Sequence, residues 1–170
     1  MRYVAFLRGV SPMNASMPKL KRCFENAGYT NVKTVLASGN VAFDSNNRSV
    51  ASLAAEIEAA MNEHLGRSFM TILRSTKFLQ ELIEADPFAR HRLPANAKRV
   101  VTFLRVPHKG KISLPPEIDG ARILAVRGGE VFTAYVPSPK GPVFMTLIEK
   151  TFGKDLTTRT WDTVQKCARA

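Results

Sequence analysis

The sequence predicts an α+β protein whose first half runs strand, helix, strand, strand, helix, strand, an order that matches a ferredoxin-like unit. Short apolar or alternating runs typical of strands are interrupted by two longer segments with apolar residues at helical spacing. Turn-forming residues separate these segments. The 170 residues, 45% of them hydrophobic, suffice for one compact unit of two subdomains, which we expect at 1–74 and 75–170.

The first half begins with an almost wholly apolar run at 3–7, a pattern that indicates a strand buried on both faces. Ser16 and Ser49 are suited to cap the two helices that follow, and Gly28 and Gly66 to end them. The expected elements are a strand at 3–7, a helix at 17–27, strands at 32–36 and 41–43, a helix from about 50 to 65 and a strand at 69–73.

The second half continues the alternation of helices and strands without a residue-level repeat, so we expect a related α+β half packed with the first. Residues 107–120, rich in Pro, Lys and Gly, are expected to form an exposed loop. The expected elements are a helix from 75 or 76 that stops before Pro87, a strand at 100–104, a hairpin of 123–126 and 131–135, a helix bearing Phe144 and Phe152, and a last helix bearing Trp161.

Positive charge is concentrated in the middle of the chain. The formal net charge is +11, from 25 basic and 14 acidic residues, and residues 86–111 hold 7 of the basic and 1 of the acidic residues. Such a cluster attracts anions and suits phosphate contacts, although a merely solvated basic surface explains it too. The candidate basic patch is Arg90, Arg92, Lys98, Arg99, Arg105, Lys109 and Lys111.

Cys23 and Cys167 lie far apart in the chain and on apolar helix stripes, which favours buried thiols over a disulfide. The longest apolar runs are only strand-length, so no membrane association is expected. The first strand begins at Tyr3, which leaves no room for a signal peptide. Together these features predict a cytoplasmic protein.

Motifs for metal, cofactor or nucleophilic chemistry are not found in the sequence. The histidines at 64, 91 and 108 are isolated, so no metal site is expected. Glycine-rich phosphate-loop signatures are missing too, and no cofactor is expected. No hydroxyl or thiol has a base at a spacing that nominates a catalytic pair, so the catalytic residues stay unknown.

Two short segments are candidates for anion binding. Ser38, Gly39 and Asn40 can present backbone N–H groups to an anion, or simply form a tight turn. At 157–163, hydroxyl residues surround Arg159 and the single Trp161 before the last helix. Capping of that helix explains most of this string, and an anion pocket at the helix N-terminus is the alternative.

Three motifs together resemble the family catalogued as domain of unknown function 1697. They are Leu7 to Val10, Ala37 to Val41 and Thr157 to Thr163, in that order. The resemblance implies a compact α+β fold with ferredoxin-like halves and a cytoplasmic location, and no reaction, cofactor or catalytic residue. Many members have an Asn and a Gly pair after the first strand, where this chain has Ser11, Pro12, Met13 and Asn14. The residues that match the family pattern, and our candidate ligand-binding set, are Arg8, Gly9, Ser38, Gly39, Asn40, Thr158, Arg159, Trp161 and Thr163.

Three functions stay open on the sequence. The leading hypothesis is binding of an anionic ligand, either nucleic acid or a phosphorylated small molecule. An enzyme acting on a phosphorylated or anionic metabolite is the second, and it needs a base such as Asp162 or a histidine beside the arginines. A homodimeric structural or adaptor protein is the third, and the sequence does not distinguish a monomer from a homodimer.

Overall fold

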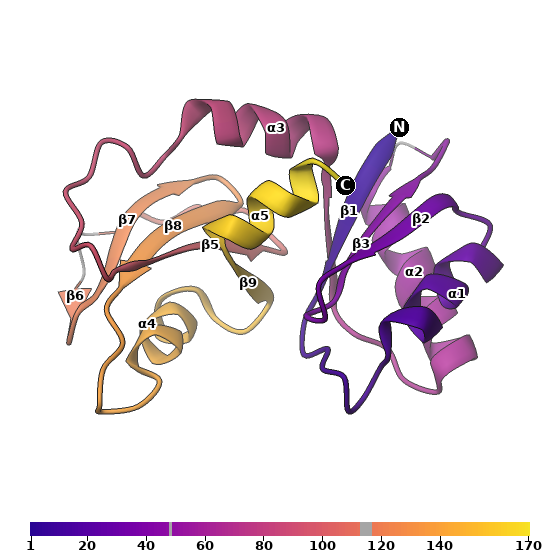
Figure 1. The fold of residues 1–170 in the computed structure, drawn as a ribbon, viewed down its shortest axis with the longest axis horizontal. Coiled ribbons are helices and arrows are strands. Elements are labelled where there is room, and N and C mark those ends of the chain that lie inside the picture. Colours follow the sequence, from indigo (N-terminus) through magenta and orange to yellow (C-terminus); the bar gives the residue numbers. More distant parts are fainter. Residues whose placement is uncertain (48, 113–116) are drawn as a thin grey trace. The chain divides into compact units, whose positions relative to one another are not determined.

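The computed structural model describes residues 1–47, 49–112 and 117–170 (Figure 1). The α+β class is confirmed, since the described residues form helices and two antiparallel sheets. The chain divides into two units, Met1–Leu82 with Gln165–Ala170, and Ile83–Val164. The first unit therefore runs past residue 74, where the sequence placed the division, and includes the chain's C-terminal end.

The first unit has the predicted order of strand, helix, strand, strand, helix, strand. Its strands pair antiparallel in the order β2-β3-β1-β4. The ferredoxin-like description of this half stays a prediction. The elements are β1 (Arg2–Leu7), α1 (Met17–Asn26), β2 (Thr30–Val35), β3 (Asn40–Asp44), α2 (Val50–Leu65), β4 (Thr71–Ser75) and most of α3 (Thr76–Ala85).

Helices α1 and α2 pack on one face of this sheet, where Tyr3, Ala5 and Leu7 of β1 join their core (Figure 1). The rings of Tyr29 and Phe43 lie 4.8 Å apart in the same core. Residues of β1 that point to the opposite face, such as Val4 and Phe6, are fully buried as well. Burial of the first strand on both faces, which its continuous apolar run predicts, is confirmed.

Arg2 holds the two ends of the chain together within the first unit. Its Nε donates to the carbonyl oxygen of Ala170 over 2.9 Å, and its Nη1 donates to Asp44 Oδ1 over 2.8 Å. Nearby, Gln80 Nε2 donates to the carbonyl oxygen of Ala168 over 3.1 Å. These bonds explain why the C-terminal end groups with the first unit.

The second unit is built on a sheet with the order β6-β7-β8-β5-β9. Two of its strands correct the sequence analysis, since β6 lies in the expected loop 107–120 and β9 lies where only the approach to a helix was expected. Residues 113–116 of that loop are outside the described residues. The elements are β5 (Lys98–Leu104), β6 (Glu117–Ile118), β7 (Ala121–Arg127), β8 (Glu130–Tyr135), α4 (Val143–Phe152), β9 (Leu156–Thr160) and the start of α5 (Trp161–Ala168).

The second sheet buries side chains on both faces. Leu147 and Ile148 of α4 pack with Ile123 of β7 on one face. On the other, the Phe88 ring meets the rings of Phe132 and Trp161 edge-on, at centroid distances of 5.9 and 5.1 Å. Among the described elements no helix lies between β5 and β7, so this half does not repeat the order of the first.

Candidate functional site

The first two sequence motifs meet inside the first unit. The backbone N–H of Leu7, at the end of β1, donates to the carbonyl oxygen of Gly39 over 2.9 Å. A Cβ added at Gly39 would lie 2.8 Å from Cβ of Val10, so only glycine lets the two segments approach this closely. The side chain that lies close to Gly39 is therefore Val10 of the same chain. Gly9, like Gly39, has a positive φ.

Asn40 is buried and acts within its own turn. Its Nδ2 donates to the carbonyl oxygen of Val35 over 2.9 Å and to Ser38 Oγ over 3.0 Å. Since the Asn40 side chain bonds the end of β2 and a residue of the connection itself, these bonds agree with the turn interpretation of this motif. Of the motif residues in this unit, Arg8 is half-buried and Ser38 is exposed.

The loop after β1 is closed by Asn14 instead of by glycines. Asn14 Oδ1 accepts from the backbone N–H of Ser11 over 2.9 Å, and its Nδ2 donates to the carbonyl oxygen of Gly9 over 2.8 Å. Met13 at the tip is 97% exposed. The departure from the family pattern at this loop therefore leaves an ordered turn.

The third motif forms β9 and the first turn of α5 within the second unit. Thr160 Oγ1 accepts from the backbone N–H of Thr163 over 3.3 Å, and the hydroxyls of these two residues lie 2.9 Å apart. This is an N-cap, as the capping interpretation predicts. Trp161 is buried, and its ring meets that of Phe88 edge-on, so it packs in the core of the second unit.

Arg159 and Thr158 lie on opposite faces of β9, because successive strand residues alternate. Arg159 is 8% exposed, and its Nη1 donates to Thr157 Oγ1 over 2.7 Å and to the carbonyl oxygen of Thr158 over 2.8 Å. Thr158 Oγ1 instead contacts Met145 Sδ of α4 at 3.9 Å. The structure does not bring these two candidates to one pocket wall. Their role in ligand binding stays a prediction.

Strand β5 divides the basic segment into two groups. Arg90, Arg92, Lys98 and Arg99 precede or begin the strand, whereas Arg105, Lys109 and Lys111 follow it. A strand of this length spans roughly 20 Å at about 3.3 Å per residue. All seven side chains are exposed, but no small ligand reaches both groups at once.

Arg92 of the first group lines a pocket of about 250 Å³ at the end of the second sheet. The pocket is lined by Arg92 from the loop before β5, Arg122 from β7 and Ala134 from β8. Among its described lining residues, Glu117 of β6 carries a carboxylate. We call this the arginine pocket. Ala134 is the strand partner of both Arg122 and Arg99, so a methyl group lies between two guanidinium side chains on one face.

Arg122 stands out within the arginine pocket. Its Nε is buried and has no hydrogen-bond partner among the described residues. Glu117 is its strand partner, yet no ion pair joins the two in the described part of the chain. Buried polar atoms normally find a partner, so an unpaired guanidinium N–H at a pocket is a place where an anion would bind well.

The sequence analysis missed Arg122, because the residue lies outside the segment of highest charge density. The signal was present, since Arg122 is a cation between Ala121 and Ile123 in a strand that is otherwise apolar up to its last residue, Arg127. A charge on such a strand is expected to be paired or functional. Only the tertiary structure places Arg122 in the same pocket as Arg92, which lies 30 positions earlier in the chain.

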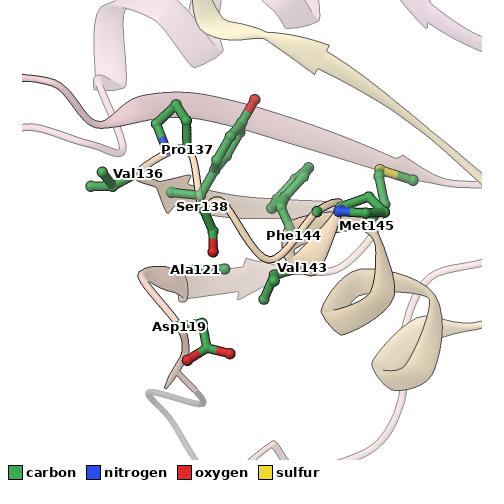
Figure 2. Close-up of a pocket in the computed structure, with 11 residues that line it drawn as sticks. Asp119, Ala121, Val136, Pro137, Ser138, Val143, Phe144 and Met145 are labelled. Atoms are coloured by element: carbon green, nitrogen blue, oxygen red, sulfur yellow. The ribbon is translucent and has the colours of Figure 1, made fainter.

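A second pocket of about 260 Å³ lies on the other face of the same sheet end, between the start of β7 and the start of α4 (Figure 2). The rings of Tyr135 and Phe144 stack in its wall at 4.7 Å, and Asp119 lies at one end (Figure 2). The Asp119 carboxylate accepts from Lys140 Nζ over 3.2 Å. Its apolar lining and carboxylate suit an uncharged group better than an anion.

The described residues contain no group of three His, Cys, Asp or Glu side chains placed to hold a metal ion. No helix in the described part combines the length and apolar character needed to cross a bilayer.

Fold and pockets define a two-unit α+β protein with a pocket at the end of one sheet, where the Nε of Arg122 has no hydrogen-bond partner among the described residues. The chain belongs to a family described as protein of unknown function (DUF1697), whose model matches residues 1–132. The third motif lies beyond the matched residues.

Among solved structures, the chain is similar to the conserved bacterial protein SP0830 from Streptococcus pneumoniae. The TM-score is 0.73 at 21% identity, over 99% of this chain and 96% of that one. This likeness supports the fold alone. No curated protein matches the chain.

Proposed function

We propose that this protein binds a phosphorylated small molecule in the arginine pocket of its second unit. The observation that carries the proposal is the buried Nε of Arg122, which lacks a partner among the described residues. Guanidinium groups bind phosphate by paired, charge-assisted hydrogen bonds. Arg92 supplies a second guanidinium, and Leu93 and Pro94 give the pocket an apolar wall for the rest of the molecule.

The size of the pocket favours a small ligand over a nucleic acid strand. About 250 Å³ accommodates a phosphate ester, whereas an oligonucleotide needs a continuous basic track. The division of the basic segment by β5 counts against such a track. We propose a cytoplasmic ligand, because two buried cysteines that form no disulfide with each other favour a reducing compartment.

The test measures binding of inorganic phosphate, adenosine monophosphate and a single-stranded oligonucleotide by calorimetry, at low and physiological salt. We expect a small phosphate ligand to bind at both salt concentrations, because salt screens charges in a pocket less than charges on an open surface. Arg122→Gln should weaken this binding by about 1.5–3 kcal/mol, the contribution of a hydrogen bond to a charged group.

Two further variants locate the effect. Lys109→Gln removes the same charge beyond the far end of β5 and should leave binding unchanged. Glu117→Gln removes the described carboxylate of the pocket and should strengthen binding, because it ends a repulsion. Equal losses in Arg122→Gln and Lys109→Gln, with salt-sensitive oligonucleotide binding, would instead identify a diffuse basic surface.

A further inference from the structure

A separate cationic pocket lies in the first unit, where α1 begins and α2 ends. Its volume is about 320 Å³. Lys19 and Arg22 of α1 and His64 of α2 line it, and Asn26 of α1 lies at its edge with Cys23. No sequence motif singled out this set, and none of its residues belongs to the arginine pocket.

The sequence brings these cations together through helix geometry. Lys19, Arg22 and Asn26 follow one another at spacings of three and four, so they share one stripe of α1. Gly66 ends α2 in a left-handed conformation, with φ of 72°, which leaves His64 in the last turn. Two helices that run in opposite directions on one sheet then place the start of one beside the end of the other.

Lys19 and Arg22, the two cations of this pocket, have no described counter-charge. Neither an ion pair nor a side-chain hydrogen bond is formed by Lys19, Arg22 or His64 among the described residues, and no described lining residue is a carboxylate. Burial raises the pKa of the Cys23 thiol, so the thiol adds no negative charge at neutral pH.

Helix dipoles do not explain the excess of positive charge. The last turn of α2 carries about half a negative charge, and the first turn of α1 about half a positive one, so the two cancel here. Lys19 and Arg22 carry full charges of the same sign on neighbouring positions of one helix face, so they repel each other. An anion between them would remove the repulsion and make new hydrogen bonds.

We propose that this pocket is a second anion site, which binds a phosphate group carried by a small organic molecule. Lys and Arg supply the point charge and the planar fork that phosphate oxygens accept. The volume exceeds what one phosphate needs, which leaves room for an ester. The Asn26 amide forms no described hydrogen bond and can bond a hydroxyl of that ester, whereas Asn14 is already engaged in its loop.

Histidine NMR tests the site, because His64 is in the first unit and the other two histidines are in the second. Inorganic phosphate and glycerol 3-phosphate are titrated at fixed pH while the Cε1–H resonances are followed. We expect a saturable shift of the His64 signal, with the ester binding more tightly than phosphate. A Lys19→Gln/Arg22→Gln double variant should weaken binding about tenfold to a hundredfold, as loss of charged hydrogen bonds does.

The matched control is Lys21→Gln/Lys33→Gln, which removes two exposed charges elsewhere in the first unit and should leave the His64 titration unchanged. Gln is nearly as good a helix former as Lys or Arg, so both variants should fold, as circular dichroism checks. Asn26→Asp gives a second variant, in which a new carboxylate should weaken binding.

A His64 signal that does not shift saturably, or shifts alike in the two double variants, overturns the proposal. Arg122→Gln should leave the His64 titration unchanged, so the proposal for this site and the proposal for the arginine pocket can be contradicted independently of each other.

Discussion

Gly39 joins the first two sequence motifs through a contact that no other residue allows. Its φ is 84°, and an added Cβ would lie 2.8 Å from Cβ of Val10 and 3.2 Å from Cβ of Leu7. The positive φ and the close neighbours both oppose a side chain here, since an L residue is strained at this φ and Leu7 is fully buried at the end of β1.

We expect Gly39→Ala to lower the free energy of unfolding by about 2 kcal/mol or more, because backbone strain and overlap add. The matched control is Gly28→Ala. Gly28 has a similar φ of 95° with nothing within 4 Å of an added Cβ, so it should lose about 1 kcal/mol from strain alone. Urea unfolding measures both variants. Equal losses would show that the Val10 contact is not the cause.

Asp44 makes the stability of the first unit depend on pH. Its Oδ2 accepts from Asn31 Nδ2 over 2.6 Å and its Oδ1 from Arg2 Nη1 over 2.8 Å, and these bonds hold the pKa of the carboxyl below its ordinary value. The folded state thus binds this proton less readily than the unfolded state. The resulting stabilisation is present at neutral pH and is lost as the pH falls through the acid range of the carboxyl.

Asp44→Asn should therefore flatten the acid side of the stability curve. At pH 7 the variant should be less stable by no more than about 1 kcal/mol, since the pair is partly exposed. As the pH falls toward 3 the difference should shrink, because the unfolded wild-type chain then takes up a proton at Asp44 that the folded state binds less readily. Melting temperatures measured between pH 7 and pH 3 check this. Curves that stay parallel over that range would contradict it.

At the scale of elements, the junction of β9 and α5 depends on one hydroxyl. Thr160 ends the strand and its Oγ1 accepts from the Thr163 N–H. We expect Thr160→Ala to destabilise the protein by about 1 kcal/mol, the usual contribution of an N-cap, and Thr160→Ser to retain most of that stability. Thermal unfolding followed by circular dichroism compares the two. A loss in the serine variant equal to that in the alanine variant would assign the effect to the threonine methyl group instead.

The two missed strands show where local pattern was insufficient. Strand β9 carries three threonines, which favour strands as much as caps, and the sequence analysis weighed a cap and an anion pocket there without a strand. Pairing with β5, which sets Val101 opposite Arg159, makes this segment a strand that ends in the cap. Strand β6 has only two residues, too few to show any period, and it exists through its pairing with β7.

At the scale of the whole molecule, the net charge of +11 does not by itself indicate which cations form a binding site. Charge density along the chain drew attention to residues 86–111, yet β5 separates their side chains into two groups. Of the cations that we consider functional, Arg92 comes from this segment, whereas Arg122, Lys19 and Arg22 lie outside it. What distinguishes them is a pocket without enough negative charge, which is a property of three dimensions.

The sequence by itself determined the α+β class, the first six elements, the burial of β1 on both faces and the capping of the last helix. These follow from apolar period, turn residues and cap residues, all of which act over a few positions of the chain. Only the tertiary structure decided that Val10 fills the space beside Gly39, that Thr158 and Arg159 face opposite ways, and that Arg92 meets Arg122. These relations depend on strand pairing and packing between distant segments, which local patterns do not encode.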